Sequence, residues 1–293
     1  MKLLAALLVV ISTISFAEEL KRPAITGIAL VRILAKDVNA SHKFYTERLR
    51  LPEVPCVIKD CRQYQVGKDQ YVQVIKADGR NNGMEVIGFK TADAEGLRRY
   101  LEVKKISVPK TVQKNSDGSQ EFEITDAEGH RVVFLQPGKL SDKRGDISHR
   151  MIHVGFVVND RGVMDRLYRE ILGFRPYWYG GWTEDHPIWV SSQVPEGTDW
   201  MEYMLDVKPN ADHHLLGIMN HYSLGIADIN DAAKGLAKSG WEPTKAEHTQ
   251  LGRDGKRQLN VWDPDDVRIE FMEFTPAEKP CCSEFTGPHP TAD

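Results

Sequence analysis

Apolar and polar residues alternate along this chain in a pattern that occurs four times. Residues 28–51 and residues 153–174 each read as an apolar strand, a turn with an aspartate, and a helix with apolar residues at helical spacing. The stretches that begin at Met84 and His221 share a second pattern, which ends in two alternating strands joined by a turn, FEITDAEGHRVVFLQ and LNVWDPDDVRIEFME. Each repeat therefore predicts one strand, one helix and about three further strands, with starts near residues 25, 84, 151 and 219.

The four units are expected to pair into two similar domains. One covers residues 24–137 and the other covers residues 150–275, with the polar stretch PGKLSDKRGD between them. A chain of 293 residues with 41% hydrophobic content is long enough for about two domains. Strands interleaved with single helices favour an α+β architecture with curved, mixed or antiparallel sheets.

The two ends of the chain differ in composition from these domains. Residues 1–17, MKLLAALLVVISTISFA, contain a lysine, a short apolar run and small residues, which is typical of a cleaved secretory signal peptide. No other segment approaches the roughly 20 apolar residues of a membrane span. We therefore expect a secreted or periplasmic protein with no membrane segment after cleavage. Residues 276–293 are rich in Pro, Thr and Gly and are expected to form a flexible tail.

Export would permit disulfides, and the four cysteines form two close pairs. Cys56 and Cys61 could close a short loop. Cys281 and Cys282 are adjacent in the tail, where soft-metal binding, intermolecular pairing or no role at all remain open.

The charge pattern excludes one class of partner. The chain has 38 Lys and Arg against 42 Asp and Glu, which gives a net charge of -4, and the two signs are interspersed. A nucleic-acid-binding protein would carry a basic patch or stripe. The expected partner is a small-molecule substrate, and a homodimer is left open.

Two histidines and two glutamates stand at equivalent places in the last two units. Glu202 follows His153 by 49 residues (202 minus 153), and Glu270 follows His221 by 49 residues (270 minus 221). Glu270 stands among apolar strand residues, where an ionised carboxylate is costly to bury unless it is paired or binds a metal. The quartet predicts one divalent metal ion held by both units. Imidazole and carboxylate ligands suit Fe, Zn, Ni, Mn or Co.

The first half of the chain lacks these ligands. Alignment of Asp37 with Asp160, and of Gly88 with Gly225, places Leu30, Gln73, Met84 and Val133 at the four ligand positions. Leu30, Met84 and Val133 offer no nitrogen or oxygen to a hard divalent ion. The N-terminal domain is therefore expected to lack an equivalent site.

This layout, with the segments HVGFVV, HYSLGI and DPDDVRIEF, resembles the vicinal oxygen chelate superfamily, which includes glyoxalase I, extradiol dioxygenases, and fosfomycin and bleomycin resistance proteins. The resemblance implies four βαβββ modules paired into two domains with cupped mixed sheets. It also implies that metal ligands occupy matching positions of two modules, and that Glu202 or Glu270 acts as a general base.

The resemblance leaves the reaction open between two chemistries. His153, His221 and Glu270 would satisfy the ferrous iron triad of an extradiol dioxygenase. That family has a tyrosine where Asn260 stands, a glycine or proline where Asp266 stands, and a histidine near residues 251–253. The loop histidines that could substitute are His248, His213 and His214.

Glu202 as a fourth ligand instead resembles glyoxalase I and related isomerases or lyases. An exported protein would rarely meet the glutathione adducts on which glyoxalase I acts, so the substrate is open. Six aromatic residues could form either the wall of a substrate site or an ordinary hydrophobic core: Tyr177, Trp178, Tyr179, Trp182, Trp189 and Tyr203. Arg257 is a candidate for binding an anionic group of the substrate.

The function favoured by the sequence is an exported, metal-dependent enzyme with glyoxalase-like isomerase or lyase chemistry on a small oxygen-chelating substrate. An extradiol-type Fe(II) dioxygenase is the first alternative. A non-catalytic small-molecule-binding protein is the second. The candidate catalytic residues are Glu202, Glu270 and His248.

Overall fold

The computed structural model describes residues 20–244 and 247–292. The signal peptide predicted for residues 1–17 lies outside the described residues, so secretion stays a prediction. Among the described residues no helix is both long enough and apolar enough to cross a membrane.

The N-terminal domain contains two βαβββ modules. The first consists of β1 (Ile25–Ala35), α1 (Val38–Lys43) with a π-helical continuation (Phe44–Arg48), β2 (Glu53–Val54), β3 (Cys61–Gln65) and β4 (Tyr71–Lys76). The second consists of β5 (Gly83–Thr91), α2 (Ala94–Val103), β6 (Gln113–Lys114), β7 (Gln120–Thr125) and β8 (Arg131–Gln136). The disulfide between Cys56 and Cys61 closes the loop that leads into β3, as the sequence allowed.

The C-terminal domain repeats this order. Its first module consists of β9 (Met151–Val157), α3 (Arg161–Asp165) with a π-helical continuation (Arg166–Ile171), β10 (Arg175–Gly180), β11 (Trp189–Gln193) and β12 (Trp200–Met204). A connecting helix, α4 (His213–Met219), leads to the second module, β13 (His221–Ile226), α5 (Ile229–Ala237), β14 (Thr249–Leu251), β15 (Arg257–Trp262) and β16 (Arg268–Glu273).

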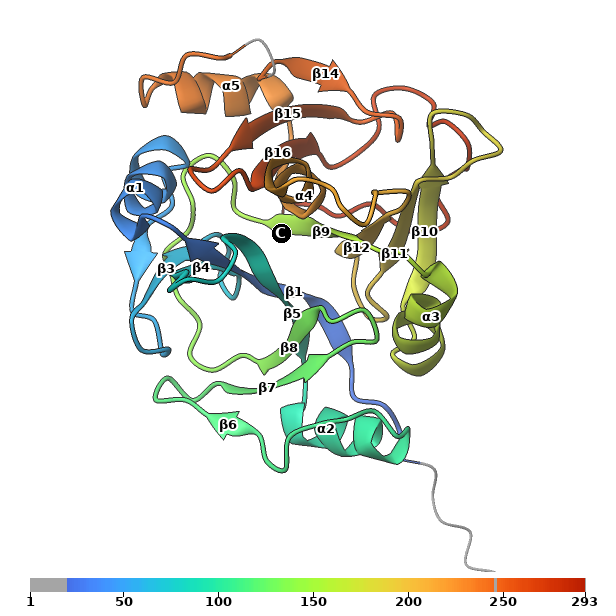
Figure 1. Cartoon of the computed structure of the whole chain (residues 1–293). Helices are drawn as coiled ribbons and strands as arrows, with labels where there is room; N and C mark the ends of the chain where they lie inside the picture. The colour runs from blue at the N-terminus through green and yellow to red at the C-terminus, as the bar shows by residue number, and fades with distance from the viewer. Residues whose placement is uncertain (1–19, 245–246, 293) are drawn as a thin grey trace, which may run out of the picture.

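Each domain is one mixed eight-stranded sheet, and the two sheets have the same topology (Figure 1). The strand orders are β2-β3-β4-β1-β5-β8-β7-β6 and β10-β11-β12-β9-β13-β16-β15-β14. In both sheets the two central strands are antiparallel and each pairs in parallel with the last strand of its own module. The predicted α+β fold with paired modules is therefore confirmed.

The helix that follows the first strand of each module, α1, α2, α3 or α5, begins in the same way in all four modules. The N-cap is an aspartate each time, and its carboxylate accepts backbone N–H groups of the first turn; the four are Asp37, Asp93, Asp160 and Asp228. Such a cap stabilises a helix by about 1 kcal/mol relative to alanine. The aspartate after each first strand is thus a local signal that fixes where the chain leaves the sheet.

A single apolar core and buried hydrogen bonds join the two domains. The core cluster contains residues of both sheets. The Gln70 amide donates to the Met151 carbonyl at 2.8 Å, and its side-chain oxygen accepts from the Met151 N–H at 2.8 Å. The Tyr45 hydroxyl donates to Asp263 at 2.8 Å. The two domains therefore pack directly against each other.

Residues 276–292 differ from the flexible tail that their composition suggests. They run back along β10, where the Thr286 N–H donates to the Tyr177 carbonyl at 3.0 Å and the Gln193 amide donates to the Pro288 carbonyl at 2.7 Å. Phe285 packs beside Tyr177 with ring centres 4.9 Å apart. The contact surface is built from strands that are distant in sequence, so composition alone gave no sign of it.

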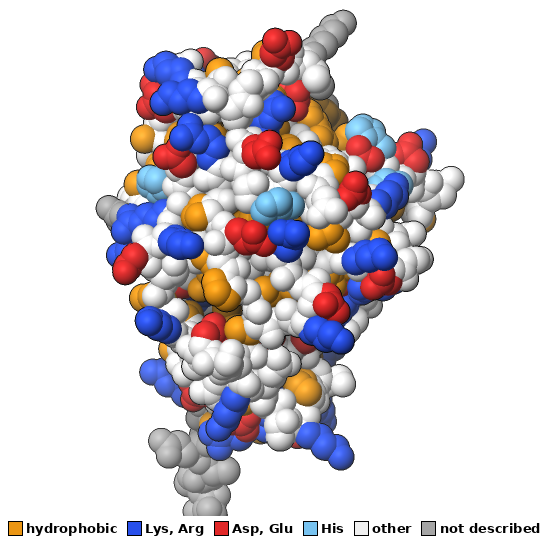
Figure 2. Space-filling model, turned by 90° about the vertical axis from the view of Figure 1, so that its left-hand side faces the viewer, with side chains coloured by type: hydrophobic (Ala, Val, Ile, Leu, Met, Phe, Trp, Pro, Cys, Tyr) orange, Lys and Arg blue, Asp and Glu red, His pale blue; other side chains and the backbone are white. Residues whose placement is uncertain are grey.

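The surface agrees with the charge pattern of the sequence. Figure 2 shows basic and acidic side chains intermixed over one face of the molecule. That face has no extended patch of one sign.

Candidate metal centre

The four predicted ligands lie on the four central strands of the C-terminal sheet. Ser223 of β13 lies opposite His153 of β9 and also opposite Glu270 of β16. Gly155 of β9 lies opposite His221 of β13 and also opposite Glu202 of β12. Each histidine therefore reaches its glutamate across one intervening strand.

The distances show how closely the two pairs approach each other. His153 Nε2 lies 3.2 Å from Glu270 Oε2, and His221 Nε2 lies 3.8 Å from Glu202 Oε2. The two Nε2 atoms lie 3.0 Å apart. His153, His221 and Glu270 each contribute one ligand atom to a group in which all atoms lie within 4.8 Å of one another. Both halves of the pseudo-twofold repeat thus meet at one point.

These separations fit a metal ion. Bonds of about 2.0 to 2.2 Å from an ion to nitrogen or oxygen place neighbouring ligand atoms about 3.0 to 3.5 Å apart. The Nε2–Nε2 and His153–Glu270 separations lie in this range. Glu202 lies 3.8 Å from His221 Nε2 but falls outside the close group formed by His153, His221 and Glu270.

The residues between the ligands are small, as this arrangement requires. A Cβ atom on Gly155 would overlap the ring of His221. Ser223, which stands between His153 and Glu270, carries only a buried hydroxyl. A larger side chain at Gly155 would therefore push the His221 ring away from the other ligands.

The environment keeps both imidazoles neutral, which metal binding requires. Burial lowers the pKa of His153 despite its contact with Glu270. Burial, together with the charge of Arg268, lowers the pKa of His221 well below its usual range. His221 Nδ1 lies 3.0 Å from the Met219 carbonyl, which accepts the ring proton and leaves the Nε2 lone pair facing the other ligands.

The two carboxylates titrate differently. Burial, reinforced by the charge of Glu270, raises the pKa of Glu202 to about 7. Burial acts on Glu270 in the same direction, but the hydrogen bond from His153 and the charge of Arg268 outweigh it and lower the pKa of Glu270. One Glu202 oxygen accepts from the Ser191 hydroxyl at 3.1 Å. The site therefore pairs an ionised carboxylate with one that can hold a proton near neutral pH.

A cavity of about 260 Å³ opens beside the ligands. Glu202 and Glu270 form part of its lining, and so do the cations Arg253 and Arg268. Three of the six predicted wall aromatics line it: Trp178, Trp182 and Trp189.

The other predicted wall and anion-binding residues lie elsewhere. Tyr177 and Tyr203 are buried in packing clusters, and Tyr179 is exposed. Arg257 is largely exposed and pairs with Glu273 at 3.6 Å instead of facing the cavity.

The loop histidines are not brought to the ligands. His248 is exposed just before β14 and does not line the cavity. His213 and His214 lie at the start of α4 and face Asp266 at 3.8 Å and 3.4 Å.

Sequence reasoning missed several residues of the site. Arg268 stands two positions before Glu270, so strand parity would have found it. Trp200 stands two positions before Glu202 and stacks on His153 with ring centres 4.7 Å apart. Lys256 Nζ lies 4.6 Å from the centre of the Trp200 ring, a contact that no local pattern reveals.

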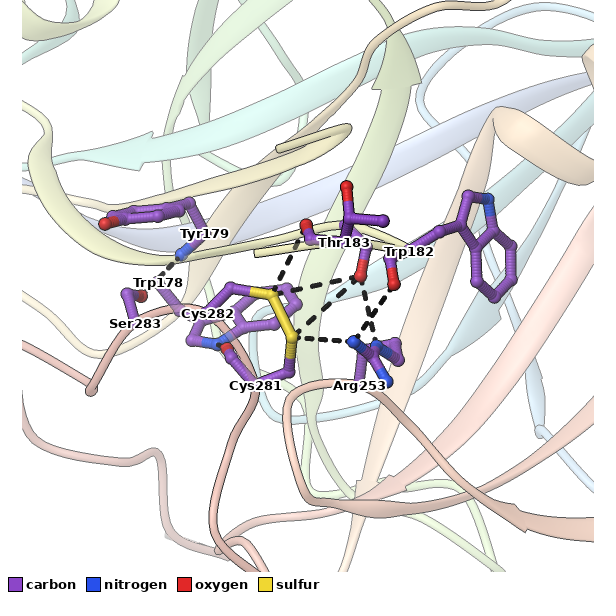
Figure 3. Close-up of a disulfide and its surroundings, with 9 residues drawn as sticks. Trp178, Tyr179, Trp182, Thr183, Arg253, Cys281, Cys282 and Ser283 are labelled. Atoms are coloured by element: carbon purple, nitrogen blue, oxygen red, sulfur yellow. Dashed lines mark hydrogen bonds between the residues drawn. A yellow bond between two sulfur atoms is a disulfide. The ribbon is translucent and has the colours of Figure 1, made fainter. Parts of the chain in front are cut away.

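The tail contacts side chains that line the rim of the cavity (Figure 3). Cys281 and Cys282 form a disulfide with each other. The Arg253 guanidinium donates to Cys281 Sγ at 2.8 Å and to the Gly181 carbonyl at 3.1 Å, while the Trp178 indole donates to the Cys281 carbonyl at 3.1 Å. The disulfide segment thereby joins the β10–β11 loop to the β14–β15 turn, on two sides of the cavity.

Comparison with known proteins agrees with this geometry. Residues 150–271 match the model of the Glyoxalase/Bleomycin resistance protein/Dioxygenase superfamily. The match covers the C-terminal domain, which is similar to the members of this superfamily. The resemblance expected from the sequence is thereby confirmed, and the matched residues include all four candidate ligands. No curated protein matches the chain by sequence.

Solved structures of the superfamily share the two-domain fold. An extradiol ring-cleaving dioxygenase from B. fuscum is 17% identical with a TM-score of 0.67, covering 86% of this chain and 73% of its own. The Mn(II)-bound glyoxalase from Novosphingobium aromaticivorans is 16% identical with a TM-score of 0.66, covering 86% of this chain and 83% of its own. At such identities the likeness establishes the fold, and it leaves the reaction to the residues of the site.

Proposed function

We propose that the C-terminal domain is a metal-dependent isomerase or lyase that acts on a small substrate chelating the ion through adjacent oxygens. The observation that carries this proposal is the position of Glu202. It completes the second His–Glu pair and also lines the cavity. A three-ligand dioxygenase site has no use for a fourth carboxylate there.

His153, Glu202, His221 and Glu270 would hold the ion, with Fe, Zn, Ni, Mn and Co as the candidates. When bound, such an ion supplies Lewis acidity that stabilises negative charge developing on a substrate oxygen. Structural similarity to a Mn(II)-bound glyoxalase is consistent with this donor set.

The side chains around the cavity would transfer a proton, orient the substrate and contact its apolar part. Glu202 is placed to take a proton from the substrate and return it, since one of its oxygens is held by Ser191 while the residue faces the cavity. Arg253 and Arg268 would orient an oxygen-rich or anionic substrate. Trp182 and Trp189, whose rings meet edge to face at 5.0 Å, would contact its planar or apolar part.

An extradiol dioxygenase is the second candidate, favoured by the close approach of His153, His221 and Glu270. The structural likeness to ring-cleaving dioxygenases is compatible with it. The chain's own residues argue against it, because Asn260 lies opposite Glu270 on β15 in place of the family's tyrosine. His248 is exposed and does not line the cavity.

Proton exchange and oxygen uptake separate the two chemistries. Purified protein loaded with each candidate ion would be incubated in D₂O with α-hydroxycarbonyl compounds, and separately with catechols on an oxygen electrode. We expect C–H to C–D exchange without oxygen uptake, lost in Glu202→Gln and kept in the exposed control Glu242→Gln. Stoichiometric oxygen uptake with catechols would instead establish the dioxygenase. Ligand binding without either reaction would favour a sequestering protein.

We further propose that the protein is exported, on the strength of residues 1–17. N-terminal sequencing of the protein from its native host should begin after Ala17. A chain that still begins at Met1 would contradict this.

A further inference from the structure

The N-terminal sheet has a cavity at the place that corresponds to the metal cavity. Its volume is about 490 Å³, within the range of small-molecule sites. Strand register makes Glu121, Arg131 and Val133 the counterparts of Gln258, Arg268 and Glu270, because each set occupies the same ladder positions. All six residues line their respective cavities. The two cavities are therefore the same feature of the repeated fold.

The side of the N-terminal cavity at Val133, here called its floor, is apolar where the other cavity has Glu270. Val133 belongs to a buried apolar cluster with Leu30, Val86 and Leu135. In the strand register Val86 lies opposite Arg32, as His221 lies opposite Gly155. The counterpart of His221 is therefore Val86, which stands two residues after the Met84 expected from the sequence. The sequence alignment on Gly88 and Gly225 was wrong by two residues there, because Val86 and its partner Arg131 are 45 residues apart (131 minus 86), whereas His221 and its partner Arg268 are 47 apart (268 minus 221). The conclusion that this half lacks metal ligands is unaffected.

Charged groups buried above this floor have unused hydrogen-bonding capacity. Arg32 is 6% exposed, and its Nε donates to Gln73 at 3.0 Å. Its Nη1 has only a 3.8 Å ion pair with Glu123. That glutamate is already held by two bonds from Arg131, at 2.7 Å and 2.9 Å. The terminal nitrogens of Arg32 thus lack a strong partner among the described residues.

Glu121 is the second such group. It is 9% exposed and lines the cavity, and its carboxylate has no hydrogen bond or ion pair within 4.0 Å among the described residues. Burying a carboxylate and a guanidinium without matched partners is costly. A domain that served only as support would be expected to fill this cavity with apolar side chains.

The wall of the cavity is braced by a disulfide. Val57, Ile58 and Lys59 line the cavity and all lie within the loop closed by Cys56 and Cys61. A loop of this length would otherwise be free to move, so the crosslink holds one side of the cavity in place.

We propose that the N-terminal cavity binds a small amphoteric carboxylic acid, such as an amino acid or hydroxy acid with an apolar side chain. Its carboxylate would accept hydrogen bonds from the Arg32 Nη groups, and its ammonium or hydroxyl group would donate to Glu121. Its apolar part would lie on Val133 and the neighbouring floor. This ligand need not be the substrate of the C-terminal domain.

The test is calorimetric titration of the full mature chain with three probes that share one aromatic body. L-Phenylalanine carries both polar groups, phenethylamine lacks the carboxylate and 3-phenylpropionate lacks the donor. We expect phenylalanine to bind at least about tenfold more tightly than either partial probe. Arg32→Gln and Glu121→Gln should each weaken binding by about tenfold, while the exposed control Lys76→Gln, which lies outside the cavity, should change it less than about twofold.

Metal content and melting temperature of each variant show whether it is folded. Binding should persist in His153→Ala, which separates this site from the metal cavity. A fourth probe, 3-phenyllactate, carries a hydroxyl group in place of the ammonium. Absence of binding by both phenylalanine and 3-phenyllactate up to about 10 mM would overturn the proposal. So would binding that is insensitive to both Arg32→Gln and Glu121→Gln, or that is lost in His153→Ala.

Discussion

The two cavities of this protein share one fold and one strand register, yet they offer opposite chemistry. The C-terminal domain has His153, His221 and Glu270 at the positions where the N-terminal domain has Leu30, Val86 and Val133. The position between the crossing pairs changes as well, from Gly155 to Arg32. The comparison teaches that a metal centre in this fold depends on the ligands and equally on the small residue that leaves room for them.

Exchanging ligands for their counterparts should have the largest effect. In His221→Val the chain keeps its strand but loses one imidazole and half of the second His–Glu pair. We expect metal affinity to fall by more than about 100-fold, since loss of even an outer-shell partner typically costs 10- to 100-fold. Competition with a chromogenic chelator measures this. A conservative substitution at the counterpart position of the other domain, Val86→Ile, is the control and should leave metal affinity unchanged.

The glycine position comes next. Gly155→Ala places a methyl group against the His221 ring, so we expect metal affinity to fall by about tenfold or more and the free energy of unfolding to fall by about 1 to 3 kcal/mol. Gly162→Ala is the matched control, because its added Cβ meets only the Asp160 carboxylate, at an ordinary contact distance of 3.4 Å. Chelator competition and urea unfolding would check both. Equal behaviour of the two variants would mean that room at Gly155 is unimportant.

Glu202→Gln gives the C-terminal domain the amide that Gln73 carries at the equivalent position of the N-terminal domain. Burial raises the pKa of Glu202 from 4.5 to about 7, so in metal-free protein the native state holds its proton more firmly than the unfolded state. This contribution is full below about pH 4.5 and is lost as the pH rises through about 7. The variant should lack this decline. Urea unfolding of both metal-free proteins across this range would reveal it, and parallel pH profiles would contradict it.

The disulfides should have the smallest and most local effects. The double variant Cys281→Ser, Cys282→Ser should keep its metal while acrylamide quenching of tryptophan fluorescence rises by about twofold, since no disulfide would then hold in place the Cys281 carbonyl that accepts from the Trp178 indole. The variant Cys56→Ser, Cys61→Ser should alter only the N-terminal cavity and serves as the control. Loss of metal in the first variant would show that the rim and the ligands are coupled.

The internal repeat explains how much of the fold and of the candidate metal site could be predicted from the sequence. Internal comparison found the modules and the four candidate ligands, because a pseudo-twofold site needs ligands at equivalent positions of equivalent strands. Parity on β16 would have added Arg268. By contrast, Arg253 lines the cavity from a turn, while Lys256 and the packed tail reach Trp200 and Trp178 through contacts between distant segments. The sequence has no period in such regions, so neither these contacts nor the exposed position of His248 could be predicted.

The most direct test of the central claim is the metal content of the purified, refolded protein after equilibration with each candidate ion and removal of the excess. We expect one equivalent per chain for the wild type and for the control Lys59→Gln, and almost none for His153→Ala, His221→Ala and the double variant. Equal metal content in the wild type and all three histidine variants would contradict a centre built from the two crossing His–Glu pairs.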